Sequence, residues 1–165
     1  YLAGVGIRKK GPVKVYSVGL YVDKKECVKN CGDPFNKNFG SKLADSSYAK
    51  ELILKMARDV TADKMANAIA EVVGGRMWGK DSKQLEDLRS AMENGFAKSG
   101  GAKTGCCLSF KSLRSKLIFS INGKKQVEVG SAVLVRAFLN TYVDQNCVSP
   151  GLKSDICETV KGWLE

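Results

Sequence analysis

The stretch KELILKMARDVTADKMANAI, residues 50–69, changes its hydrophobic period halfway along. The first half alternates with a period of two, which predicts a strand over residues 50–60 with one face well buried. From Thr61, a residue type favoured at helix N-caps, apolar side chains recur three and four positions apart and predict a helix that ends at Gly74-Gly75. The positions expected to face the core are Leu52, Leu54 and Met56 in the strand and Met65, Ala68, Ile69 and Val72 in the helix.

Upstream of this unit, VKVYSVGLYV at residues 13–22 is rich in Val and Tyr and follows the turn residues Gly11-Pro12. It predicts a strand entered from a turn. The polar stretch at residues 23–47 predicts a long loop with room for a short helix.

Downstream, residues 82–98 place apolar side chains on one helical face, and residues 108–110 and 117–121 predict strands. Asn122-Gly123 is a strong hairpin signal, and further helices are expected from Ser131 and from Ser149. Strands and helices thus occur in separate runs. This order predicts an α+β fold, an antiparallel sheet with helices packed on one face.

Composition narrows the function classes. The 165 residues, of 17.9 kDa, suit one domain over residues 1–165, and the apolar runs are too short to cross a membrane. The 27 Lys and Arg against 17 Asp and Glu give a net charge of +10, which favours anionic partners. The absence of histidine excludes Ser-His-Asp and Cys-His nucleophiles and histidine-ligated zinc.

The six cysteines leave their redox state open at first. Cys27 and Cys31 could form a disulfide in an oxidising compartment, whereas Cys106 and Cys107 fall in a predicted strand, where buried free thiols are common. No pair of Cys-x-x-Cys motifs is present, so we expect no metal site and no cofactor. A disulfide between close cysteines constrains the unfolded chain only weakly. We therefore predict that all six thiols are reduced.

Five blocks of sequence, taken in order, resemble one known family. They are YLAGVGIR (1–8), VKVYSVGLYVD (13–23), KELILKMARDVTADKMANAI (50–69), LIFSINGK (117–124) and AFLNTYVDQNCVSPGLK (137–153). The chain resembles the chalcone isomerase fold, and specifically its fatty-acid-binding and chalcone isomerase-like branches. The resemblance implies an open-faced β-sandwich with a large antiparallel sheet, helices over one face and a ligand cleft between them. Since the sequence starts at Tyr1, we expect the opening strands of the family to be missing or short.

The enzyme branch of this family cyclises chalcones with five polar groups. Arg8 and Thr141 match two of them, and Tyr16 stands where the enzymes keep a threonine, so these three would be the catalytic residues of an isomerase. Thr61 and Ala68 fall at the positions of the catalytic tyrosine and asparagine. Because an alanine cannot donate a hydrogen bond to an oxyanion, we expect little cyclisation and lean against an enzyme.

The pair Arg8 and Tyr16 instead resembles the fatty-acid-binding branch, in which an arginine and a tyrosine on neighbouring strands receive a carboxylate at the end of an apolar tunnel. A guanidinium offers two parallel donors to a carboxylate, and a phenol adds a third without a second buried charge. The resemblance implies non-catalytic binding of a long-chain fatty acid or a similar amphipathic carboxylate. The expected ligand-binding residues are Arg8, Tyr16, Val18, Leu54, Met65, Phe138, Thr141 and Tyr142.

Several alternatives stay open. The apolar members of this set could be ordinary core residues, and Thr141 could bond a helix carbonyl. The protein could be a weak, ancestral-like isomerase. The charge could also serve a basic module for anionic surfaces or nucleic acid, although scattered lysines are typical of a solvated surface. We expect a monomer with no nucleic-acid partner, and the resemblance favours a plastid or another organelle lumen.

Overall fold

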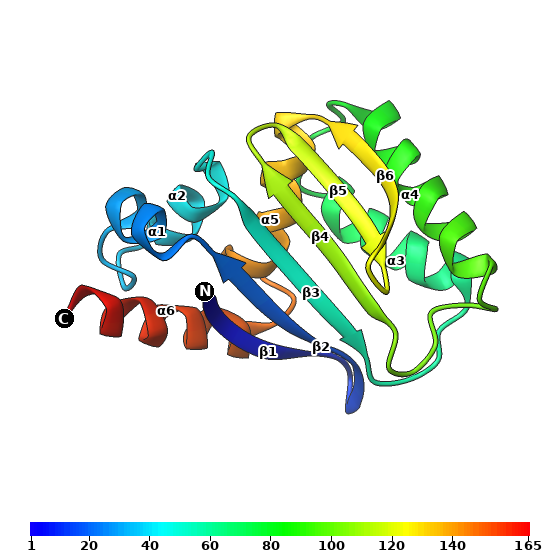
Figure 1. Cartoon of the computed structure of the whole chain (residues 1–165), viewed down its shortest axis with the longest axis horizontal. Helices are drawn as coiled ribbons and strands as arrows, with labels where there is room; N and C mark the ends of the chain where they lie inside the picture. The colour runs from blue at the N-terminus through cyan, green and yellow to red at the C-terminus, as the bar shows by residue number, and fades with distance from the viewer.

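The strands form one antiparallel sheet in a computed structural model that describes residues 1–165. All six strands pair in sequence order, each with the next (Figure 1). They are β1 (Leu2–Lys10), β2 (Val13–Val22), β3 (Lys50–Met56), β4 (Cys107–Leu113), β5 (Lys116–Ile121) and β6 (Lys124–Gly130). The strands β1 and β6 are therefore the two edges of the sheet.

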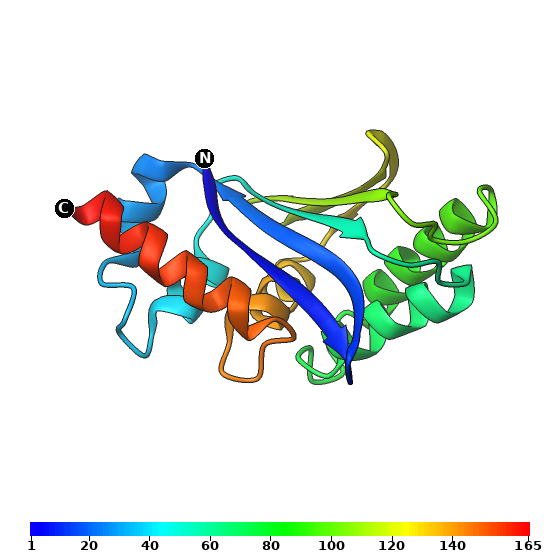
Figure 2. The ribbon, with the colours of Figure 1, turned by 90° about the horizontal axis from the view of Figure 1, so that it is seen from below.

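Helices cover one face of this sheet. They are α1 (Lys24–Cys31), α2 (Phe39–Asp45), α3 (Ala62–Gly74), α4 (Ser82–Ala97), α5 (Ala132–Val143) and α6 (Pro150–Leu164). Figure 2 shows the layer of helices on one side of the strands and no element on the other side. The predicted α+β architecture, an open-faced sheet with helices over one face, is confirmed.

Burial along the strands follows the period of two. In β2, Tyr16, Val18, Leu20 and Val22 are buried, whereas the alternate Tyr21 is exposed. The core between sheet and helices contains a run of packed rings. Their centroids lie 4.9 Å apart between Phe110 and Phe119 and 4.4 Å apart between Phe110 and Phe138.

The structure corrects two predicted segments. The strand predicted to reach Val60 ends at Met56, because Val60 turns away and pairs with Ala102 instead. The predicted loop at residues 23–47 contains both α1 and α2. Asp23 caps α1 by accepting a hydrogen bond from the backbone N–H of Glu26 at 3.0 Å.

The start of α6 packs tightly against β1, which is nine residues long. A Cβ atom on Gly6 would come within 2.5 Å of the Leu152 backbone nitrogen, so only glycine permits this approach. Ser149, from which this helix was expected to start, is its N-cap residue, but its hydroxyl donates to the Ile7 carbonyl at 3.1 Å and makes no capping bond to the helix. These contacts hold the segment before α6, including Val148, beside β1.

Cys27 and Cys31 lie buried on one side of α1, and all six thiols are free in the structure. The Cys107 residue opens β4, and Cys106 directly precedes that strand. None of the helices has the length and the apolar composition that crossing a membrane requires.

Candidate functional site

A cleft opens between helix α3 and the adjoining ends of β1 and β2. Its volume is about 700 Å³, within the size range of ligand pockets. On the helix side the exposed residues Ala68 and Glu71 leave it open to solvent. Its aliphatic lining comes from both walls and consists of Val13, Val15, Val60, Met65, Ala68, Ile69, Val72 and Val148.

Arg8 stands at the strand side of the cleft. It lies on the edge strand β1 directly opposite Tyr16 of β2. One guanidinium nitrogen, Nη1, donates to the Val148 carbonyl at 3.2 Å. The side chain takes part in none of the ion pairs of the structure. Because a guanidinium carries five N–H donors, most of its donors are free for an anion in the cleft.

The hydroxyl of Tyr16 lies 3.0 Å from the hydroxyl of Tyr142 on α5. Tyr142 is 2% exposed, and Tyr16, at 6%, lines the cleft. Burial raises the pKa of Tyr16 above its ordinary value, although Tyr142 and Arg8 partly offset this. Burial also raises the pKa of Tyr142 well above its usual range. Both phenols are therefore protonated at neutral pH, and each keeps one O–H donor.

Comparisons with known proteins place the fold in a family. A sequence model of the family described as chalcone isomerase-like matches residues 1–157. The chain belongs to this family. A similar solved structure is that of the fatty-acid binding protein AtFAP1 from Arabidopsis thaliana. Its TM-score is 0.82 at 21% identity, over 99% of this chain and 90% of that chain. No curated protein sequence matches the chain.

The cleft also brings together the positions at which the chalcone isomerase-like chain departs from the enzyme pattern. Thr61, at the N-cap of α3, and Ala68, two turns along that helix, both line it. Arg8 and Tyr16 lie on the opposite wall. Ala68 has no polar atom in its side chain to stabilise a developing oxyanion.

Of the eight residues that the sequence suggested as ligand contacts, Arg8, Tyr16 and Met65 line the cleft. The other five lie in the core beneath it, and none is more than 2% exposed; they are Val18, Leu54, Phe138, Thr141 and Tyr142. Thr141 donates to the Ala137 carbonyl at 2.9 Å, as a helical threonine commonly does. Its hydroxyl therefore does not face the cleft, and any contact of these five with a ligand stays a prediction.

Sequence reasoning missed several groups at this site. Tyr142 was expected as an apolar contact, yet its hydroxyl is the partner of Tyr16. Val148 supplies the carbonyl that holds Arg8. Val13 and Val15 also line the cleft, beside a register shift between Arg8 and Lys9. The Val-rich strand was the only signal in the sequence for this aliphatic wall.

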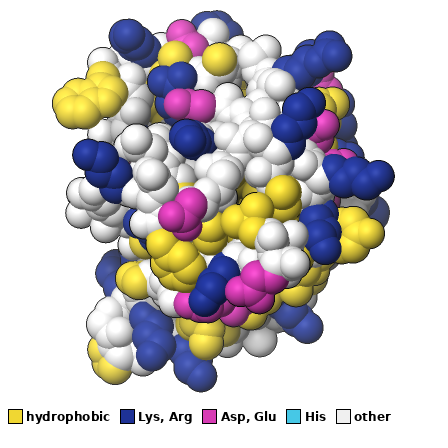
Figure 3. Space-filling model, turned by 90° about the vertical axis from the view of Figure 1, so that its left-hand side faces the viewer, with side chains coloured by type: hydrophobic (Ala, Val, Ile, Leu, Met, Phe, Trp, Pro, Cys, Tyr) yellow, Lys and Arg dark blue, Asp and Glu magenta, His cyan; other side chains and the backbone are white.

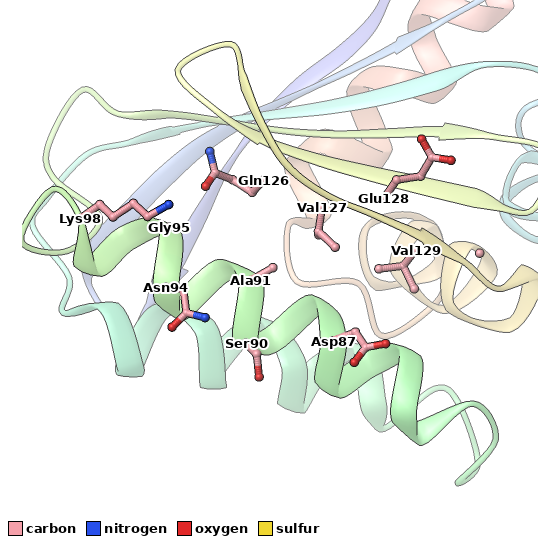
Figure 4. Close-up of a pocket in the computed structure, with 11 residues that line it drawn as sticks. Asp87, Ser90, Ala91, Asn94, Gly95, Lys98, Gln126, Val127, Glu128 and Val129 are labelled. Atoms are coloured by element: carbon pink, nitrogen blue, oxygen red, sulfur yellow. The ribbon is translucent and has the colours of Figure 1, made fainter.

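A second hollow lies between α4 and the edge strand β6. Figure 4 shows polar side chains of both elements around it, among them Asp87, Asn94 and Gln126. Its volume is about 600 Å³, and only three of its 11 lining residues are hydrophobic. Such a lining does not suit an alkyl chain, so the cleft at Arg8 is the better candidate.

Proposed function

We propose that this protein binds a long-chain fatty acid, or a similar amphipathic carboxylate, in the cleft between α3 and the β1–β2 pair, and that it does so without catalysis. The observation that carries the proposal is an arginine without a carboxylate partner, set opposite a buried tyrosine at an aliphatic cleft. Arg8 is half-buried, and a guanidinium beside an apolar surface favours an anion as partner. A ligand carboxylate would supply the missing one.

The hydrogen-bond directions support this role. Tyr142 is sealed in the core, and the only partner of its hydroxyl is Tyr16. If Tyr142 donates to Tyr16, the proton of Tyr16 is left to point into the cleft. A bound carboxylate would then accept from the Arg8 guanidinium and from the Tyr16 phenol, which are charge-assisted bonds. Tyr142 acts here as a positioning residue.

The aliphatic lining supports the apolar half of the ligand. Methylene groups that leave water for contacts with Val13, Met65 and Val72 contribute about 0.8 kcal/mol each. A tail that continued toward Val18, Leu54 and Phe138 would have to displace packed core side chains. Contact with those three residues therefore requires the floor formed by Tyr16 and Met65 to open.

The departures from the enzyme pattern support the non-catalytic part. Cyclisation of a chalcone needs donors at the oxygen where charge develops, and removing one such donor costs about 3 kcal/mol of transition-state stabilisation. The Ala68 side chain supplies no hydrogen-bond donor. At the position of the enzymes' catalytic tyrosine, Thr61 has a hydroxyl on a shorter side chain. Relationship to a fatty-acid binding protein of the same fold points in the same direction.

The test uses delipidated protein in two assays. Calorimetric titration with laurate and with longer acids is expected to give saturable binding with one site. A chalcone absorbance assay is expected to show no turnover above the solution rate. Absence of fatty-acid binding would refute the proposal, and turnover to enantiomerically enriched flavanone would replace it with catalysis.

A further inference from the structure

Five exposed cations lie on the elements that form the strand end and the helix end of the cleft, and we call them the basic collar: Lys9, Lys10, Lys14, Arg58 and Lys64. Three of them belong to the β1–β2 hairpin, one to the loop after β3 and one to the first turn of α3. None takes part in an ion pair. Lys10, Arg58 and Lys64 line the cleft itself.

Backbone contacts hold the collar together. The N–H of Ala57 donates to the Val15 carbonyl at 2.9 Å, which fixes the loop of Arg58 beside the hairpin. Lys9 and Lys14 are directly opposite each other across β1 and β2. Like charges in that position destabilise a strand pair, and no carboxylate offsets them here. The sheet alone gives no reason for this arrangement.

The carboxylates near the mouth do not neutralise the collar. Asp59 is already engaged by the Lys103 ammonium at 3.6 Å and by the N–H and hydroxyl of Thr104. Asp63 and Glu71 remain, against five cations. Asp63 lies in the first turn of α3, where it already faces the positive end of the helix dipole. The mouth therefore has an excess of positive charge.

The β1–β2 hairpin protrudes beside the mouth of the cleft (Figure 1). The turn of the β1–β2 hairpin extends past the ends of the neighbouring strands (Figure 1). Its turn residue Gly11 has a φ of +57°, and Val13 beside it is 38% exposed. Val13, an aliphatic side chain beside Lys10 and Lys14 at the protruding turn, suits a lipid–water interface, where long lysine stems keep the charge at the headgroups.

We propose that the basic collar docks the mouth of the cleft onto an anionic lipid bilayer. Polybasic surfaces are attracted to anionic headgroups, and the attraction weakens as salt rises. Docking in this orientation would let an amphipathic ligand pass between bilayer and cleft without crossing water. Only this last consequence rests on the proposed function, because the docking itself follows from the charge and shape of the mouth.

The test is vesicle flotation of the whole protein at low salt, about 0.05 M, and high salt, about 0.5 M. Vesicles of phosphatidylcholine alone are compared with vesicles in which about a third of the lipid is phosphatidylglycerol. We expect binding to the anionic vesicles only, and release at high salt. The double variant Lys9→Glu/Lys14→Glu keeps a like-charge pair across the strands. Its affinity for the anionic vesicles is expected to fall by a factor of about ten or more. A Lys9→Gln/Lys14→Gln variant, which removes the repulsion, is expected to lose binding as well.

A matched control changes the net charge equally at the far end of the molecule. Figure 3 shows that end, where basic and acidic side chains are interspersed. Lys25 and Lys29 of α1 are exposed and unpaired there, and Lys25→Glu/Lys29→Glu is expected to keep vesicle binding. Equal loss in both double variants would show that net charge alone is responsible and would overturn the proposal. So would wild type that ignores anionic vesicles but captures nucleic acid through the collar.

Titration of laurate in vesicle-free solution separates this proposal from the proposed function. Docking without laurate binding would support the role of the basic collar in membrane docking and refute the proposed fatty-acid binding. Laurate binding without docking would support fatty-acid binding and refute membrane docking.

Discussion

The two ends of the β2–β3 pair each bury a tyrosine hydroxyl beside a cation, yet they are built differently. At one end Tyr16, opposite Met56, meets Tyr142 and Arg8. At the other end Lys50, opposite Val22, is 2% exposed. Its ammonium donates to the Ser46 carbonyl at 2.6 Å and to the Tyr48 carbonyl at 3.1 Å. Six residues of strand, about 20 Å, separate the two sites.

The difference lies in what the cation has left to donate. The Lys50 ammonium has two carbonyl partners and also lies 4.2 Å from the centre of the Tyr48 ring. Arg8 has one carbonyl partner and faces a cleft of about 700 Å³. A buried cation whose donors are satisfied within the protein has little left to offer a ligand. A cation with spare donors at a cleft is available to a ligand.

Truncating Lys50 is the change with the largest expected effect. The Lys50→Ala variant removes a buried stem and leaves two carbonyls without their donor, so we expect a loss of about 3 kcal/mol in the free energy of unfolding. Laurate affinity should stay as in wild type. Chemical denaturation and calorimetric titration measure the two quantities. Weakened laurate binding in a folded Lys50→Ala protein would contradict the separation of the two ends.

The Lys50 end of the β2–β3 pair should also make the free energy of unfolding depend on alkaline pH. Burial lowers the pKa of Lys50 to about 8 from its ordinary 10.5, so between these values the unfolded state binds more protons than the folded state. The free energy of unfolding must then rise with pH in that window. We expect Lys50 itself to contribute a gain of about 2 kcal/mol between pH 8 and pH 10. Hydrogen bonding to Cys31 raises the pKa of Cys27, and burial raises the pKa of Cys106 and Cys157, so these three thiols act in the opposite direction.

Lys50→Met is the control for this pH effect, since it keeps most of the stem and removes the titrating group. Its unfolding free energy should rise clearly less over the same interval. Urea denaturation at each pH measures the unfolding free energy of both proteins. An identical rise in the two would assign the pH effect to groups other than Lys50.

At the cleft, removing the positioning hydroxyl should have a smaller effect. Tyr142→Phe keeps the packed ring but leaves the Tyr16 hydroxyl without its partner, so we expect laurate affinity to fall by about 1 kcal/mol, or about fivefold. Calorimetric titration measures the change. The matched control is Tyr21→Phe on the open face of the sheet, which should bind as wild type does. Equal affinity in Tyr142→Phe would remove Tyr142 from the site.

The smallest expected effect is that of reductant on stability. Cys27 and Cys31 are 0% and 1% exposed, and we expect all six cysteines to be thiols in the native protein. Thiol counting on protein unfolded without reductant should give six, and added reductant should leave the Tm unchanged. Four free thiols would mean that a disulfide exists and would favour an oxidising compartment.

Local patterns in the sequence predicted those parts of the fold whose burial repeats along one element. The strand β2 has the predicted bounds, because its side chains alternate between core and solvent. The helix α1 was hidden in a predicted loop, because most of its residues are polar and only Cys27 and Cys31 are buried. The predicted end of β3 was wrong, because Val60 leaves the sheet to pair with Ala102.

The candidate site was predictable only in part, for a similar reason. Arg8 and Tyr16 were found through the family resemblance, and their cross-strand pairing follows from the hairpin. The partners that orient them lie more than 120 residues away, since Tyr142 and Val148 reach them through the packing of α5 and α6. No local period encodes such a contact. The sequence also does not show how deeply a side chain lies below the cleft. Val18 and Leu54 were therefore expected to contact the ligand but lie in the core.

The most direct test of the account compares laurate with its methyl ester on two proteins. Calorimetric titration of wild type and Arg8→Ala is expected to show laurate affinity falling by about 2 kcal/mol, or about 30-fold. Methyl laurate, which has no carboxylate, should bind both proteins equally. Arg136→Ala is the control, since that arginine pairs with Asp45 away from the cleft. If laurate affinity is unchanged in Arg8→Ala, or if both ligands lose equally, the carboxylate does not lie at Arg8 and the account fails.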